Sequence, residues 1–174
     1  MTDLDRLIES TLDERELAYQ HPASGRFFVT LPGVKKLQTN CWLIIGGHGM
    51  VVEAFVCRRP DEAHEVVYRF LLHRNAKLYG VHYTLDQVGD IYLVGRVALD
   101  RITADELDRL LGQVLEAADG DFNTLLELGF ASSIRREWEW RTSRGESLAN
   151  LAAFEHLVRA PDGHDGRFGA VPDS

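Results

Sequence analysis

The sequence predicts an α+β fold, in which an antiparallel β-sheet has helices packed on it. Two patterns predict this fold. Several segments with the two-residue periodicity of strands follow one another across short turns rich in glycine and proline, and strands joined so tightly run antiparallel. Other segments carry apolar residues at helical spacing, and each of these stripes has to be buried against the sheet. The predicted order of elements is α-β-β-β-α-β-β-α-α.

Composition and charge narrow the class of protein before any motif is considered. The 174 residues are 45% hydrophobic and carry a formal net charge of −8, which argues against direct binding of nucleic acid. No apolar run approaches the ~20 residues that span a bilayer, and the first residues are acidic and polar. We therefore expect a cytoplasmic protein with no membrane segment, whose two cysteines, Cys41 and Cys57, stay reduced.

The first half of the chain holds one helix and three strands. The helix is predicted from Thr2 to about Tyr19, because apolar residues recur there at helical spacing. Strands are predicted at 26–31, 37–45 and 50–57. The glycine-rich break at 46–49 is typical of a four-residue hairpin loop, which pairs Cys41 with Ala54 and Trp42 with Glu53. Because side chains alternate along a strand, Cys41 and Cys57 are expected on opposite faces of this hairpin.

The second half continues with a helix, two strands and further helices. Pro60 and two acidic residues open the helix, and strands follow at 78–85 and 91–99. A capping box from Thr103 to Glu106 begins the next helix, and a four-residue apolar repeat from Leu126 to Trp138 indicates another. The predicted organisation is one α+β domain at 1–144, a C-terminal amphipathic helix at 145–159 and a disordered tail at 160–174, which is rich in Pro, Gly and Asp.

Several local runs carry a resemblance to a known family. They are the run 26–31 with its following strands, Arg59-Pro60-Asp61 leading into 67–75, and 89–93. Over roughly residues 1–140 the chain resembles the YbjN family, its actinobacterial members above all, whose fold is like that of type III secretion chaperones. The resemblance implies a dimer-prone, partner-binding module with stress-related or regulatory roles and no established enzyme activity. The shared fold does not imply a role in secretion.

The runs that resemble metal-binding or phosphate-binding motifs are better explained as turns between elements of secondary structure. The run from Asp119 to Asn123 begins like a calcium loop, but the sixth and twelfth positions hold Thr124 and Phe130 instead of Gly and Glu, which favours an interhelical turn. The glycines at 46–49 lie between two strands and lack a lysine, which favours a hairpin over a phosphate loop. No catalytic residue, metal ligand or cofactor is predicted.

The second face of the sheet is the more informative feature. Alternation turns one set of apolar residues toward the helices and leaves an opposite face rich in aromatic groups, which is typical of protein interfaces. Two alternatives remain for that face: a partner protein binds it, or the C-terminal helix packs on it. Trp140 is a further candidate because it lies off the apolar stripe of its helix. The candidate interface residues are Phe28, Trp42, Glu53, Phe55, His82, Tyr92, Arg96 and Trp140.

The function that these patterns favour is a non-enzymatic protein-binding module, chaperone-like or regulatory and stress-related, that acts as a homodimer in the cytoplasm. Its partner would be another protein, with no cofactor, no metal, no direct nucleic-acid contact and no membrane contact. The alternative is a small-ligand sensor or an uncharacterised enzyme with a cleft between sheet and helices.

Overall fold

In the computed structural model, which describes residues 1–159, the chain divides into two units, Met1–Phe130 and Ala131–Ser174. The predicted disordered tail, 160–174, lies outside the described residues. No helix within 1–159 is long and apolar enough to cross a membrane.

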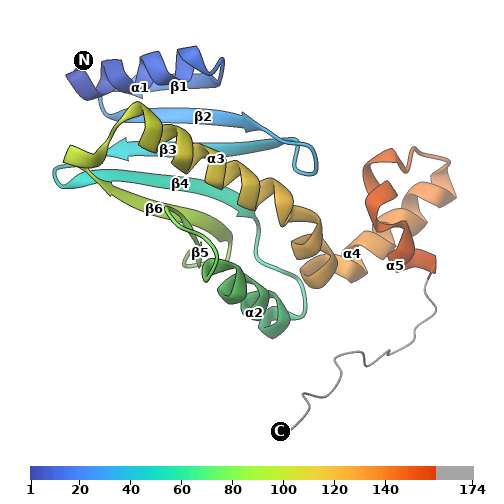
Figure 1. Cartoon of the computed structure of the whole chain (residues 1–174). Helices are drawn as coiled ribbons and strands as arrows, with labels where there is room; N and C mark the ends of the chain where they lie inside the picture. The colour runs from blue at the N-terminus through green and yellow to red at the C-terminus, as the bar shows by residue number, and fades with distance from the viewer. Residues whose placement is uncertain (160–174) are drawn as a thin grey trace, which may run out of the picture. The chain divides into compact units, whose positions relative to one another are not determined.

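The first unit contains a six-stranded antiparallel sheet in the order β1-β2-β3-β4-β6-β5. Its helices α1, α3 and α2 lie on one face of this sheet, with α3 across the middle strands, α1 at the β1 edge and α2 at the β5 edge (Figure 1). The strands are β1 (Ala18–Ala23), β2 (Arg26–Pro32), β3 (Gln38–Ile45), β4 (Gly49–Cys57), β5 (His82–Leu85) and β6 (Ile91–Ala98). The helices are α1 (Asp3–Glu14), α2 (His64–Asn75), the 3-10 turn η1 (Leu99–Arg101) and α3 (Ala104–Gly120).

The core lies between the sheet and the helices. Alternate residues of the central strands are fully buried, among them Phe27 and Val29 of β2 and Leu43 of β3. The partners that cover them include α3, whose stripe contains Leu107, Leu110, Leu111 and Val114, all buried. The register pairs Cys41 with Ala54 and Trp42 with Glu53. The predicted hairpin and its register are therefore confirmed.

The first helix is shorter than predicted, and a strand follows it. The predicted helix reached Tyr19, whereas α1 ends at Glu14 and Glu16 adopts a left-handed conformation with φ 54°. Ala18–Ala23 then pairs with β2 as an edge strand, so the sheet has six strands instead of five. An edge strand that is only half covered needs few apolar residues, and β1 contains Gln20, His21 and Pro22. Its sequence pattern is weak for that reason.

A β-bulge near the end of β4 changes which way Cys57 points. The register shifts between Phe55 and Cys57, and both Val56 and Cys57 are buried. Cys57 pairs with Ile91, which is buried under the helices, so the thiol faces the same side as Cys41. The prediction of opposite faces is wrong, because the extra residue of a bulge resets the alternation. Both cysteines are free.

The second unit begins within α4 (Phe122–Arg144), whose helical conformation is broken at Phe130 (φ −139°, ψ 18°). The predicted helix at 145–159 is a 3-10 helix, η2 (Ala149–Phe154), followed by the short α5 (Glu155–Arg159). Within this unit the Arg135 Nε donates a hydrogen bond to the carbonyl of Leu157 at 3.0 Å. That contact ties α5 back to α4.

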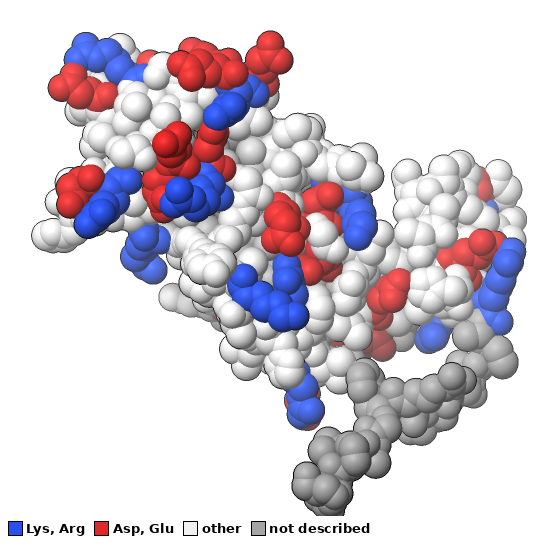
Figure 2. All heavy atoms as spheres, viewed as in Figure 1, with Lys and Arg blue, Asp and Glu red and all other residues white. Residues whose placement is uncertain are grey.

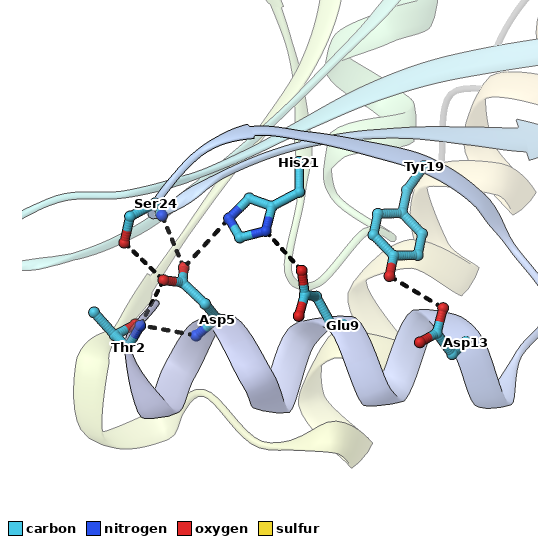
Figure 3. Close-up of polar contacts among 8 residues, drawn as sticks. Thr2, Asp5, Glu9, Asp13, Tyr19, His21 and Ser24 are labelled. Atoms are coloured by element: carbon cyan, nitrogen blue, oxygen red, sulfur yellow. Dashed lines mark hydrogen bonds and ion pairs between the residues drawn. The ribbon is translucent and has the colours of Figure 1, made fainter.

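A buried carboxylate joins α1 to the β1–β2 hairpin (Figure 3). Asp5 is fully buried and accepts hydrogen bonds from the Ser24 hydroxyl at 2.6 Å, the Thr2 backbone N–H at 2.7 Å and the Gly25 backbone N–H at 2.8 Å. The Ser24 hydroxyl, followed by the two backbone donors, holds the pKa of Asp5 far below its usual range although burial opposes this. The helix start and the hairpin turn thus share one ionised acceptor.

The same surface of α1 makes three more polar contacts with β1 (Figure 3), and in the first of them the His21 Nε2 lies 3.8 Å from an Asp5 carboxylate oxygen. The His21 Nδ1 lies 2.7 Å from a Glu9 carboxylate oxygen, and its ring stacks on Phe27 with centroids 4.1 Å apart. The Tyr19 hydroxyl donates to Asp13 at 3.0 Å. The contacts follow one another in opposite order along the two elements, so β1 runs antiparallel to α1.

We expect Asp5→Asn to destabilise the protein at neutral pH by about 1.5–3 kcal/mol, because an amide cannot replace an ionised acceptor of several donors. Since the pKa of Asp5 is lowered in the folded state, its stabilisation is complete above the ordinary aspartate value of about 3.9 and declines as pH falls below it. Urea titrations of both proteins at neutral and acidic pH measure the difference. The control is Asp3→Asn, which changes an exposed carboxylate of the same helix turn. A difference between wild type and Asp5→Asn that stays constant with pH would contradict this role.

Candidate functional site

The face of the sheet that points away from α1, α2 and α3 is the candidate site, and we refer to it as the open face. None of its side chains is buried, and Phe55 is 39% exposed. The residues of the open face are Arg26, Phe28, Trp42, Ile44, Val51, Glu53, Phe55, His82, Tyr92, Val94 and Arg96. A sheet face on which several aromatic and aliphatic side chains stay in contact with water is typical of a contact site.

The strand register brings the predicted residues into rows across the open face. One row runs from Phe28 through Trp42, Glu53 and Val94 to His82. The rings of Phe28 and Trp42 lie 4.8 Å apart, tilted by 57°. In the next row Phe55 pairs with Tyr92, with centroids 5.5 Å apart and an edge-to-face angle of 75°. Aromatic pairs in such geometries attract one another and present a rigid apolar surface.

Trp140 is not part of this group. It belongs to the second unit, is 46% exposed and lies against Arg144, whose guanidinium carbon is 4.9 Å from the centroid of the indole ring. The other seven predicted interface residues share the open face. Sequence alternation could also have found Arg26 and Val51, which belong to the same register row as Ile44 and Arg96.

Lys36 borders the open face and no sequence signal indicated it. Its ammonium nitrogen lies 5.9 Å from the centroid of the Phe55 ring and 5.2 Å from that of Phe122. Burial lowers the pKa of Lys36. The residue comes from the β2–β3 loop, whose folded path no periodicity predicts, and cation–π contacts hold the side chain beside the aromatic residues.

The acidic run at the end of α3 has structural partners. One oxygen of Asp119 accepts backbone hydrogen bonds from Val34 at 2.9 Å, Lys35 at 2.7 Å and Lys36 at 2.8 Å. Burial acts to raise the pKa of Asp119, but these donors outweigh it and lower the pKa. Asp121 accepts from the Tyr83 hydroxyl at 2.8 Å and from Arg74 at 2.7 Å. The predicted interhelical turn is confirmed, and both carboxylates hold the fold together.

The two thiols are buried and protonated at neutral pH. Burial raises the pKa of Cys41 to about 12 and that of Cys57 to about 11, so neither forms the thiolate that nucleophilic catalysis needs. Within the described part of the chain, no three His, Cys, Asp or Glu side chains form a group that could hold a metal ion. The open face offers aromatic contact area instead of reactive groups.

A second exposed apolar surface lies on α2 and β5, and we refer to it as the α2–β5 surface. Leu72 is 68% exposed, Val66 50% and Leu85 40%. Leu72 stands between two hollows, one of about 300 Å³ beside Tyr68 and Leu85 and one of about 590 Å³ beside Phe70 and Lys77. The outer edge of β5 is closed at Tyr83, whose backbone N–H and C=O both bond the Asn75 side chain. A partner can therefore contact this surface through its side chains, but it cannot extend the sheet by pairing with β5 at Tyr83.

Comparison with known proteins gives one family and several relatives. The YbjN family, described as "Putative bacterial sensory transduction regulator", matches residues 5–127. Proteins of Mycobacterium tuberculosis and Mycobacterium bovis are each 61% identical over 159 residues, which cover 88% of this chain and 87% of the relative. A Mycobacterium leprae protein is 60% identical over 158 residues, which cover 87% and 85%. All three are described as uncharacterized proteins.

Three solved structures share the fold. A chain of the ExsC–ExsE complex has a TM-score of 0.53 at 17% identity and covers 70% of this chain and 92% of that one. The heterodimeric ExoU–SpcU complex of the Pseudomonas aeruginosa type III secretion system gives 0.50 at 17%, covering 71% and 98%. YbjN from E. coli gives 0.50 at 16%, covering 70% and 89%. At these identities the likeness concerns the fold alone, and the predicted type III secretion chaperone-like fold is confirmed.

We expect Phe55→Ala to cost only about 1–2 kcal/mol of unfolding free energy, because its side chain keeps contact with water. Phe27→Ala, on the buried face of the neighbouring hairpin, is the matched control and should cost about 3–5 kcal/mol. Urea titration of both variants measures the two losses. Equal losses would mean that Phe55 is part of a core, and the open face would then be no contact site.

Proposed function

Because the chain belongs to the YbjN family, as its sequence resemblance predicted, we propose that it is a non-enzymatic protein-binding module that holds another protein on the open face. The observation that carries this proposal is the two aromatic pairs, Phe28 with Trp42 in a tilted contact and Phe55 with Tyr92 edge to face, on a face with no buried side chain. Aromatic residues near the centre of a contact surface supply most of the binding energy in protein complexes.

The structures of similar fold support this choice. Two of them, the ExsC–ExsE and ExoU–SpcU complexes, contain a protein of this fold together with a second protein. We further assign the module to the cytoplasm and to a regulatory or stress-related role. The family description as a sensory transduction regulator and the two free, buried thiols support this assignment.

We also propose that the protein is a homodimer that associates through the α2–β5 surface. Leu72 projects between two apolar hollows, so two copies related by a two-fold axis can each insert this side chain into a hollow of the other. The blocked edge of β5 favours this side-chain packing over the pairing of strands. The dimer would leave the open face available for the partner.

The binding proposal is tested by immobilising the wild type and the variants Phe55→Ser and Tyr92→Ala, and by identifying the proteins that each one retains from a lysate of the organism that produces it. Truncation of an interface aromatic typically costs about 2 kcal/mol or more, so affinity should fall roughly 25-fold. The control is Tyr79→Ala, which removes an exposed aromatic residue outside the open face. Proteins that wild type and Tyr79→Ala retain, but both open-face variants lose, are the expected result. Identical recovery by all four proteins would contradict the proposal.

The dimer proposal predicts that light scattering of the wild type gives twice the chain mass of 19.6 kDa at micromolar concentration. Leu72→Asp should shift the mass to that of one chain, because a carboxylate cannot enter an apolar hollow without a large desolvation cost. Leu37→Asp, which changes a leucine of similarly high exposure in the β2–β3 loop, should stay dimeric. A wild type of single-chain mass, or a dimeric Leu72→Asp, would refute this dimer.

A further inference from the structure

Two arginines lie at one end of the open face without an ion-pair partner. The register places Arg26, Ile44, Val51 and Arg96 in one row across β2, β3, β4 and β6. Both arginines are exposed, and none of the ion pairs found within residues 1–159 includes either guanidinium. The two cations therefore flank an apolar pair, Ile44 and Val51, on an otherwise uncharged row.

This arrangement differs from the helix side of the same unit. There basic and acidic side chains lie beside one another (Figure 2). Arg6 pairs with Asp3, Arg109 with Glu106 and Arg69 with Glu65. The chain has eight more acidic than basic residues, so carboxylates are abundant in it. Two arginines of the open face that nevertheless have no ion-pair partner favour the binding of a negatively charged group at this row.

A hollow beside Arg96 is suited to receive a side chain. It measures about 390 Å³ and is lined by the loop 46–49, Val51 and Arg96. Gly49 holds the loop close to β6, because a Cβ at that position would lie 2.4 Å from the carbonyl oxygen of Val97. The guanidinium thus borders a concave surface in which position 49 admits no residue larger than glycine.

We propose that the partner segment recognised by the open face is acidic and apolar, with a carboxylate at the Arg26–Arg96 row and an apolar side chain against Phe55 and Tyr92. This inference rests on the proposed function and specifies its partner. Arg96 and Tyr92 are four residues apart on β6, which corresponds to about 13 Å. An extended segment spans that distance with a carboxylate and an aromatic or aliphatic residue at positions i and i+4, both on one side.

The centre of the open face argues for a carboxylate over a polyanion. Glu53 lies in the row between the arginines and the Phe55–Tyr92 pair. A nucleic acid or an anionic lipid surface would bring phosphates over this carboxylate and toward a chain of net charge −8. A peptide can present one carboxylate to the arginines and apolar groups to the rest.

The test uses three synthetic peptides of one sequence, with apolar residues at the positions that contact Phe55 and Tyr92, in which only the position four residues away is Asp, Asn or Lys. Fluorescence anisotropy measures their affinity for the full chain at low and high salt. The aspartate peptide should bind roughly tenfold or more tightly than the asparagine peptide, and the difference should shrink as salt screens the charges. Arg26→Gln with Arg96→Gln should abolish the difference, and Arg6→Gln on α1, the control, should preserve it.

The outcomes separate this inference from the proposed function. Equal binding of the aspartate and asparagine peptides that Phe55→Ser abolishes would overturn the acidic partner and leave the contact face standing. Binding that none of the open-face variants changes, or no binding at all, would overturn both. A single-stranded oligonucleotide or an anionic vesicle that binds more tightly than the aspartate peptide, with the same arginine dependence, would assign the row to phosphate and overturn the inference.

Discussion

The structure depends on a sheet that is covered by helices on one side only. The apolar stripe of α3 matches the inward residues of β2, β3 and β4, and burial of these side chains fixes the strand register. A slip by one residue would exchange the two faces and place Glu53 under the helix. The same register that builds the core therefore also assembles the open face, because its aromatic residues occupy the alternate positions of the same strands.

Buried carboxylates hold the elements at the borders of this sheet. Asp5 joins the start of α1 to the turn between β1 and β2, and Asp121 joins α3 to Arg74 of α2 and Tyr83 of β5. Each accepts hydrogen bonds from segments far apart in the sequence, and such bonds to an ionised acceptor are stronger than neutral ones. Part of the acidic excess of the chain is thus structural and not available to a partner.

Periodicity predicts the parts of this molecule that repeat. The hairpin of β3 and β4, the stripe of α3 and seven of the eight candidate interface residues follow from alternation and helical spacing alone. The features that the sequence could not predict are local departures from the repeating patterns of strands and helices. The bulge at Val56 and Cys57, the break of α4 at Phe130 and the edge strand β1 each involve a few residues with no repeat. Lys36 belongs with these, since a loop places it beside Phe55.

The contact between Asp119 and the β2–β3 loop bears on the order in which the chain folds. The carboxylate is 83 to 85 residues away from the backbone groups that it binds. Gly33 turns so tightly that a Cβ there would lie 2.2 Å from the Lys36 carbonyl oxygen. A helix such as α3 forms from local contacts, whereas this loop gains its acceptor only after α3 has docked. The loop, and with it the position of Lys36 beside the open face, is consequently a late event in folding, so a nascent chain completes its contact face only once synthesis has passed α3.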